Sequence, residues 1–171
     1  MTRQLSSTPS VLFIGPPSSG VSTIISSLCR LFNCLLSPHG IHLLKINKQN
    51  IFFIELNSDI TARHLWKHAV SDGVDLICFV IDSADQETLQ DAKNELLALL
   101  PFCQDTPIIL VTNKQDLTGS LTPENILNYF KPNNCCNSIT CIPTVGKNQK
   151  EIGWNIDLLG SKIVEICLRN K

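Results

Sequence analysis

Apolar runs and polar turns alternate along the chain in a pattern that predicts strands separated by helices. The run at 76–81 is apolar at every position, which is typical of a central parallel strand buried on both faces. Two strands expected at 41–46 and 50–56 are close enough in sequence to form a hairpin. The remaining predicted strands cover 11–14, 108–111 and 139–142.

Helical periodicity fills the segments between these strands. Residues 84–100 place leucines and an alanine at helical spacing, and Thr122 followed by Pro123 provides an N-cap and a favourable first residue for another helix. Alternation of this kind predicts an α/β fold with a mostly parallel sheet and helices on both faces. Ligands bind such folds at the carboxyl ends of the strands. The other helices are expected at 21–32, 63–68 and 155–168.

Length and charge fit one intracellular α/β domain. The 171 residues suit a single core, expected over 11–168 after a short polar arm at 1–10. Charged residues make up 17% of the chain, below the usual roughly 25%. This shortage indicates either apolar surface reserved for a partner or a plain bias of composition. The net charge of −1 provides no basic field, so nucleic acid is not expected as a partner.

No segment resembles a membrane anchor or a targeting signal. A transmembrane helix needs about 20 apolar residues, which no run approaches, and the first ten residues are polar. Thr2 stands where a myristoylated glycine would be, and residues 168–171 form no prenylation box. The eight cysteines include no CxxC, and Cys78 and Cys167 lie in apolar runs. Such thiols are typical of a reducing cytoplasm, and the adjacent pair at 135–136 favours a plain loop over a metal site.

Residues 15–22 match the spacing and context of a phosphate-binding loop except at one position. The pattern G-x-x-x-x-G-K-[ST] lies between a strand and a helix, and here Val21 replaces its lysine. Backbone N–H groups and the helix N-terminus can still hold phosphate, and the Ser22 hydroxyl can reach Mg²⁺. A lost charge partner costs about 3–5 kcal/mol, so weakened binding is expected, while a purely structural turn is the alternative. The predicted phosphate-binding residues are Gly15, Ser18, Ser19, Gly20, Val21, Ser22 and Thr23.

A second motif, N-K-Q-D at 113–116, directly follows the strand predicted at 108–111. N-K-x-D recognises guanine in GTPases: the Asp116 carboxylate can accept two N–H donors of the base, which adenine does not offer. The stem of Lys114 would pack along the base, and Asn113 would tie this loop to the phosphate loop. The alternative is a polar turn in which Asp116 caps a neighbouring segment.

Together these motifs resemble the Arf-like branch of the small GTPases. The family's R-x-L-W, V-D-S-x-D and N-K-Q-D-L patterns correspond to residues 63–68, 80–85 and 113–117, and the resemblance extends over about 11–168. It implies a small G domain of the P-loop NTPase class with a six-stranded sheet. It also implies GTP or GDP and Mg²⁺ as cofactors, switch segments that bind effector or regulatory proteins, and a role in intracellular trafficking.

The chain departs from the family at the switch positions. Glu55 replaces the Mg²⁺-linked aspartate, Asn57 and Ser58 replace two glycines, and Asp59 replaces the water-positioning glutamine. His39 and Gly40 lie where a switch threonine is expected. Loss of the water-positioning residue removes a main contribution to hydrolysis, so the chain is expected to be at most a slow GTPase with no assigned catalytic residue. Another lysine, such as Lys45, is one hypothesis for the missing ammonium.

Several other residues suggest sites but have simpler explanations. His64 and His68 are four residues apart on a helix, without a glutamate after His64, so surface histidines are favoured over a zinc site. Trp66 is expected under the switch region and Trp154 in the core. The segment 143–146 resembles the family's first switch but follows the guanine motif, so the likeness is taken as coincidence. By position, residues 141–145 correspond to the loop that contacts the guanine oxygen, although the usual Ser-Ala pair is not evident there.

Three functions remain open on the sequence. The leading interpretation is an Arf-like protein that binds guanine nucleotide weakly and recruits partners with slow or absent hydrolysis. The second is a nucleotide-free pseudo-GTPase whose switch region and hairpin form a fixed binding surface. The third, a conventional active GTPase, requires several substitutions to be compensated.

Overall fold

The structure is a computed structural model that describes residues 8–34, 36–46, 49–56, 58–59, 61, 63–103, 105–130, 137–146 and 152–169. Most of the expected polar arm, the cysteine pair at 135–136 and Asn57 therefore lie outside the described residues. The strands are β1 (Ser10–Ile14), β2 (Ile41–Ile46), β3 (Gln49–Glu55), β4 (Leu76–Asp82), β5 (Ile108–Asn113) and β6 (Ile139–Pro143). The helices are α1 (Val21–Leu31), α2 (His64–Ser71), α3 (Leu89–Cys103), α4 (Pro123–Phe130) and α5 (Ile156–Arg169).

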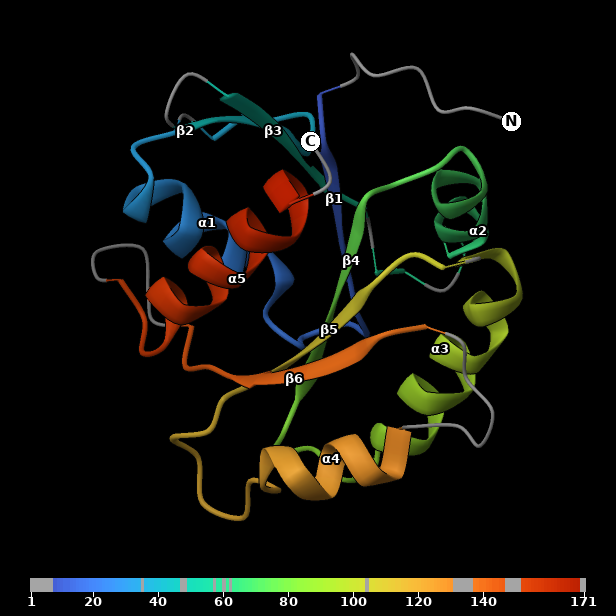
Figure 1. Cartoon of the computed structure of the whole chain (residues 1–171). Helices are drawn as coiled ribbons and strands as arrows, with labels where there is room; N and C mark the ends of the chain where they lie inside the picture. The colour runs from blue at the N-terminus through green and yellow to red at the C-terminus, as the bar shows by residue number, and fades with distance from the viewer. Residues whose placement is uncertain are drawn as a thin grey trace.

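The six strands form one mixed sheet in the order β2-β3-β1-β4-β5-β6 (Figure 1). β2 and β3 pair antiparallel as the predicted hairpin, with Leu43 opposite Phe52, and the other neighbours pair parallel. The predicted α/β architecture with a six-stranded, mostly parallel sheet is thus confirmed. Parallel order brings the carboxyl ends of β1, β4 and β5 to the same edge of the sheet, where ligands bind in folds of this type.

Helices cover both faces of the sheet because neighbouring strand residues point to opposite sides. Phe13 belongs to a buried cluster with α1 and α5, whereas the adjacent Leu12 belongs to a cluster with α2, α3 and α4. Figure 1 shows the same arrangement, with α1 and α5 on one side of the central strands and α2 and α3 on the other. None of the helices in the described ranges combines the length and apolar character that crossing a bilayer requires.

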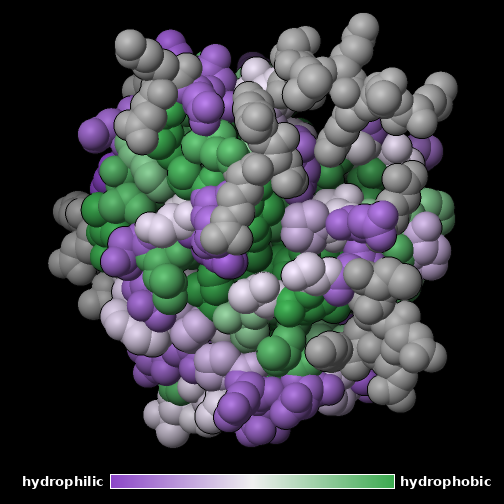
Figure 2. Space-filling model, viewed as in Figure 1, coloured by the Kyte–Doolittle hydropathy of each residue, from purple (hydrophilic) through white to green (hydrophobic). Residues whose placement is uncertain are grey.

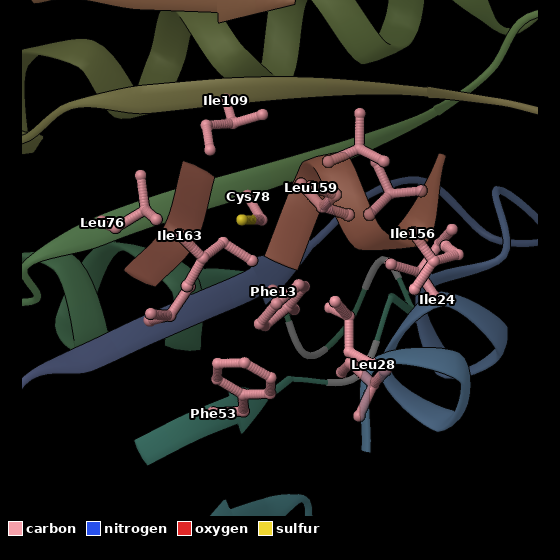
Figure 3. Close-up of a cluster of buried hydrophobic side chains, with 14 of the residues drawn as sticks. Phe13, Ile24, Leu28, Phe53, Leu76, Cys78, Ile109, Ile156, Leu159 and Ile163 are labelled. Atoms are coloured by element: carbon pink, nitrogen blue, oxygen red, sulfur yellow. The ribbon is translucent and has the colours of Figure 1, made fainter. Parts of the chain in front are cut away.

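The larger cluster packs around two phenylalanines on adjacent strands (Figure 3). The rings of Phe13 and Phe53 meet edge to face with centroids 5.0 Å apart, an arrangement that aromatic pairs favour. Leu28 of α1 and Ile163 of α5 complete the packing, and both are fully buried. The helix that leaves the first turn and the helix that ends the chain therefore share one hydrophobic centre.

The helix predicted at 84–100 begins later, at Leu89. Two aspartates explain the difference, because their carboxylates accept backbone N–H groups that a helix would need. Asp82 Oδ1 accepts the N–H of Ala84 at 3.0 Å, and Asp85 Oδ1 accepts the N–H of Thr88 at 3.3 Å. Such local bonds hold a turn in competition with helix. At α4 the predicted cap is confirmed, since Thr122 Oγ1 accepts the N–H of Asn125 at 3.3 Å.

The two tryptophans occupy opposite environments. Trp66 is 1% exposed and meets Phe79 edge to face with centroids 6.4 Å apart. Trp154 was expected in the core, but its side chain is 54% exposed. The expectation was wrong because Trp154 lies in the connection before α5, where its backbone carbonyl accepts the N–H of Val145 at 3.2 Å in an isolated bridge.

Truncation of the aromatic centre should destabilise the fold strongly. We expect Phe13→Ala to lower the free energy of unfolding by about 3–5 kcal/mol, because it removes a fully buried ring and leaves a cavity. Urea denaturation measures the loss. Phe102→Ala, at a 40% exposed ring near the end of α3, is the control and should cost less than about 1 kcal/mol. Equal losses in the two variants would contradict the described core.

Candidate functional site

A cavity of about 750 Å³ opens at the carboxyl ends of β1 and β3, beside the start of α1. Its wall combines the loop after β1, the segment before β2 and the end of β3, with one residue from the turn after β5. The sequence had assigned phosphate and switch roles to most of this wall. The lining residues are Pro16, Ser18, Ser19, Gly20, Val21, Ser22, Thr23, Ser37, Pro38, His39, Gly40, Glu55, Leu56, Ser58 and Lys114.

The loop after β1 curls back on itself before α1 begins. Ser18 and Gly20 have φ angles of 64° and 98°, and the N–H of Ser19 bonds the carbonyl of Pro16 at 3.2 Å. The first bond of α1 runs from Ile24 N–H to Gly20 O at 3.0 Å. The N–H groups of residues 21–23 therefore have no acceptor within the helix, and all three residues line the cavity. A helix N-terminus of this kind attracts anions.

Two glycines allow this loop to pack closely. A Cβ at Gly15 would lie 2.3 Å from the carbonyl oxygen of Val80, so the loop can start against β4 only without a side chain. A Cβ at Gly20 would lie 2.3 Å from Nδ2 of Asn113, and the φ angle of 98° is itself unfavourable for other residues. Both glycines are thus required by contacts with neighbouring strands.

Ser22 and Glu55 meet at the floor of the cavity. The Ser22 hydroxyl donates to Oε1 of Glu55 at 2.5 Å. The other carboxylate oxygen lies 3.8 Å from Nε2 of His42, which is 2% exposed. Nδ1 of His42 accepts the N–H of Ser37 at 2.9 Å, so in the neutral ring the proton resides on Nε2 and faces the carboxylate. The serine and the glutamate are thus hydrogen-bonded, and the buried Nε2 of His42 lies beside them without a hydrogen-bond partner of its own among the described residues.

The segment expected to act as a switch lies directly against Glu55. The backbone N–H of Glu55 donates to the carbonyl of Gly40 at 2.7 Å, and both His39 and Gly40 line the cavity. Ser58 also lines it, whereas Asp59 is exposed and lies outside the lining. Asn57 is outside the described residues.

Asn113 connects three segments beneath the cavity. It is 2% exposed, and its Nδ2 donates to the carbonyl of Ser19 at 2.9 Å. Its Oδ1 accepts the N–H of Gly146 at 2.8 Å, and its backbone carbonyl accepts the N–H of Ser83 at 3.0 Å. The tie between the N-K-Q-D turn and the phosphate loop, which the sequence implied, is present in this geometry, and it also includes the segment 143–146.

The next residues of the motif point in different directions. Lys114 lines the cavity, and its ammonium bonds Oδ2 of Asp82 at 2.7 Å. Gln115 donates from its side chain to the hydroxyl of Ser83 at 2.8 Å and to the carbonyl of Leu121 at 3.1 Å, which secures the turn. Asp116 is exposed at the end of this turn and is not among the described residues that line the cavity.

Lys45 does not reach this cavity. It is exposed on β2 and lines a separate cavity of about 550 Å³ together with Cys34 and Leu43. The hypothesis that Lys45 replaces the missing ammonium therefore has no support, and Lys114 is the lysine among the described lining residues. His64 and His68 are both exposed, with ring centroids 6.4 Å apart.

Two residues of this region were not assigned roles from the sequence. Asp82, the partner of Lys114, lies at the end of β4 opposite Asn113 in the parallel register. His42 lies in β2, where its neighbours Ile41 and Leu43 are exposed. For Asp82 the signal in the sequence was a polar residue at the carboxyl end of a strand. For His42 it was a polar residue at an inward position of a strand that alternates between exposed and buried residues.

The fold, with its strand, glycine-containing loop and helix and with the N-K-Q-D turn after β5, is that of a small G domain. The ADP-ribosylation factor family model matches residues 2–151, and the chain belongs to this family. It is 31% identical over 115 residues to ADP-ribosylation factor-like protein 10 of Mus musculus and over 114 residues to ADP-ribosylation factor-like protein 9 of Homo sapiens. These alignments cover 65% and 64% of this chain but only 47% and 60% of the relatives, so the match spans about half the length of these proteins.

A third relative and two solved structures extend the comparison. ADP-ribosylation factor-like protein 3 of Chlamydomonas reinhardtii is 28% identical over 121 residues, which is 68% of each chain. The Arl6 BBS3 small GTPase of Trypanosoma brucei, solved with the nucleotide analogue GppNp, superposes with a TM-score of 0.77 at 18% identity, covering 96% of this chain and 100% of the other. A chain of the mammalian SRP receptor superposes with a TM-score of 0.74 at 16% identity, covering 92% and 99%. Both structures agree with the small G domain fold.

Gly119 and Gly20 have similar positive φ angles but different surroundings. Replacing each by alanine should therefore separate the cost of the backbone conformation from the cost of a steric clash. Gly119→Ala, at a φ of 85° with open space around the new Cβ, should cost only the left-handed penalty of about 1–2 kcal/mol. Gly20→Ala adds a clash with Asn113, so we expect its loss in urea unfolding to exceed that of Gly119→Ala by about 1–3 kcal/mol as hydrogen bonds break. Equal losses would show that Asn113 does not approach this loop.

Proposed function

We propose that this chain binds guanine nucleotide and Mg²⁺ weakly and acts by recruiting a protein partner, with slow or absent hydrolysis. The observation that carries the proposal is the Asn113 side chain, which joins the N-K-Q-D turn to the loop after β1, and residues of both segments line one cavity. In this proposal residues 15 and 18–23 hold the phosphates and Lys114 and Asp116 hold the base. Residues 11–168 act as one G domain, in a reducing cytoplasm.

The residues at the cavity floor fit a magnesium ion. Mg²⁺ prefers oxygen ligands, and proteins commonly supply one or two of them while phosphates and water supply the rest. The Ser22 hydroxyl and the Glu55 carboxylate are such oxygens, already within hydrogen-bond distance of each other. The ion would neutralise part of the phosphate charge. In the family pattern the lysine does this, but Val21 stands at its position here.

The same wall explains why hydrolysis should be slow. Catalysis of phosphoryl transfer to water needs a group that orients the attacking water. Asp59 stands at that position in the sequence, but its side chain is exposed and lies outside the lining of the cavity. No other residue is assigned to orient the water. Bound GTP would therefore persist until a partner protein stimulates hydrolysis or until the nucleotide exchanges.

An apolar surface beside the switch segment supports partner recruitment. On the outward face of the hairpin, Ile41, Leu43 and Phe52 are 53%, 39% and 37% exposed, and Leu36 nearby is 54% exposed. Figure 2 shows hydrophobic surface gathered on the side where Figure 1 places α1, α5 and the hairpin. Contiguous exposed apolar patches mark interaction sites in soluble proteins.

The second candidate is the nucleotide-free scaffold, and one observation favours it. Val21, in the place of the lysine, is 8% exposed and packs in the core cluster with α5, so it contributes to folding at a position where the family uses charge. The Ser22–Glu55 bond would then be purely structural. In this case the apolar face of the hairpin would be the functional surface by itself.

Nucleotide content of the purified protein decides between these functions. The protein is denatured, and the supernatant is separated by anion exchange. Bound GDP or GTP would support the proposal, and the ratio of the two would report hydrolysis. An empty protein that also fails to bind added guanine nucleotide with Mg²⁺ would overturn the proposal and leave the scaffold.

Asp116 should determine base selectivity. We expect Asp116→Ala to weaken GDP binding by about tenfold or more, because a charge-assisted pair with the base is lost, whereas ADP binding should not change. Titration with a fluorescent nucleotide measures both. The control is Asp72→Ala, at an exposed carboxylate directly after α2 and outside the N-K-Q-D turn. Unchanged GDP affinity in Asp116→Ala would contradict base reading by this turn.

Restoration of the lysine should strengthen phosphate binding. Val21→Lys is expected to tighten GTP binding by about tenfold or more, since it supplies a cation at the start of α1, beside the proposed phosphate site. Val21→Met, with a side chain of similar length and no charge, is the matched control. Titration in the presence of Mg²⁺ measures both variants. Equal affinities would show that phosphates do not approach the start of α1.

A further inference from the structure

The end of α1 forms a helix-terminating motif that contains two cysteines. Asn33 has a φ of 53°, its N–H donates to the carbonyl of Arg30 at 3.3 Å, and the N–H of Cys34 donates to the carbonyl of Cys29 at 2.8 Å. This pair of bonds defines the Schellman motif. The motif brings the third-last helical residue against the second residue after the cap, a contact that is usually hydrophobic. In this chain both positions are cysteine.

The backbone bond sets an upper limit on the distance between the two cysteines. Standard bond lengths and angles along the path from one Cα through N–H and O=C to the other limit the separation to about 6.5 Å. Disulfides span Cα distances of about 4.4–6.8 Å. Each thiol also shifts the pKa of the other, as expected for two groups held this close.

We propose that Cys29 and Cys34 are a redox modification site, which a small-molecule disulfide such as oxidised glutathione converts into an intramolecular disulfide. The motif places the two cysteines side by side, and both are free in the structure. No residue of the candidate nucleotide site takes part, so the proposal stands apart from the proposed function.

The surroundings of the two thiols indicate different roles in the exchange reaction. Cys34 is half-buried and lines the cavity of about 550 Å³, so a small disulfide can reach it, whereas Cys29 is 1% exposed. The hydrogen bond from Cys29 lowers the pKa of Cys34, and the same interaction, together with burial, raises the pKa of Cys29. A lower pKa means more thiolate at neutral pH, and the thiolate is the attacking form. Cys34 is therefore the nucleophile.

The reaction balances as two thiol–disulfide exchanges. The Cys34 thiolate attacks one sulfur of the small disulfide, the S–S bond breaks, and one thiolate leaves and takes up a proton. Cys29 then loses its proton, its sulfur attacks Sγ of Cys34, and the second small thiol is released. Two protein thiols are oxidised to one disulfide while one small disulfide is reduced to two thiols.

Among the described residues, the other cysteines lack this combination of contact and access. Cys78 and Cys167 are buried in the core, and burial raises the pKa of both, that of Cys167 to about 12. Burial also raises the pKa of Cys141, to about 11. A raised pKa lowers the thiolate fraction and hence the rate of exchange. The described chain thus favours reaction at the end of α1.

The sequence makes the test direct, because trypsin cleaves after Arg30, between the two cysteines. Residues 4–30 and 31–45 are then separate peptides, each with one cysteine, that stay joined only by this disulfide. The full reduced chain is equilibrated with mixtures of reduced and oxidised glutathione, quenched with acid, blocked with a maleimide, digested and analysed by mass spectrometry. The equilibrium constant against glutathione is measured with and without urea.

We expect the joined peptides as the main oxidised product, with an equilibrium constant about tenfold or more above that in urea, because the motif holds the thiols together. Cys29→Ser should stop at a mixed disulfide of Cys34 with glutathione, and Cys141→Ser, at another half-buried cysteine, should still give the joined peptides. The proposal is overturned if wild-type protein gives a different cysteine pair, if Cys34 remains a mixed disulfide, or if folding does not raise the constant. The wild-type result decides even where a variant fails to fold.

Discussion

The hydrogen bonds of Asn113 are the interaction on which the arrangement of the candidate site depends. One buried side chain holds the carbonyl of Ser19, the N–H of Gly146 and, through its own backbone, the N–H of Ser83. These groups belong to the loop after β1 and to the connections after β6 and β4, which are far apart in the sequence. A buried polar group is costly unless it is paired, and here the side-chain amide of one residue pairs with two of the segments while its backbone carbonyl pairs with the third. The hydrogen bonds of Asn113 therefore help to set the positions of Lys114 and of the loop after β1.

Most of the fold was predictable, because strands buried in a parallel sheet are apolar runs that need no tertiary information. β2 agrees with its predicted bounds at 41–46, and β4 extends the predicted run by one residue, to Asp82. The start of α3 was missed because it depends on which aspartates turn back to the backbone. Trp154 was misplaced because hydrophobicity predicts burial only where an element packs, and this residue lies in a connection.

The candidate site was less accessible to sequence reasoning. The spacing of residues located the loop at 15–22 and the turn at 113–116, because the shape of a short loop depends mainly on its own residues. The pairing of Lys114 with Asp82 depends on the register between β4 and β5, and the contact of His42 with Glu55 depends on the hairpin. The proximity of Cys29 and Cys34 depends on where α1 ends. The sequence predicted that end at residue 32, one residue beyond the observed Leu31. Long-range register and helix ends are what patterns alone leave undetermined.

The contrast between the two tryptophans has a spectroscopic consequence. The chain contains only Trp66 and Trp154, one enclosed against Phe79 and one largely in solvent. Intrinsic fluorescence is therefore the sum of a blue-shifted component from the α2 side and a red-shifted component from the connection before α5. Because the carbonyl of Trp154 holds Val145, next to the Gly146 that Asn113 binds, the red component arises beside the tie between the loops. Native emission thus has one component from the α2 side of the sheet and one from the connection before α5, without any added label.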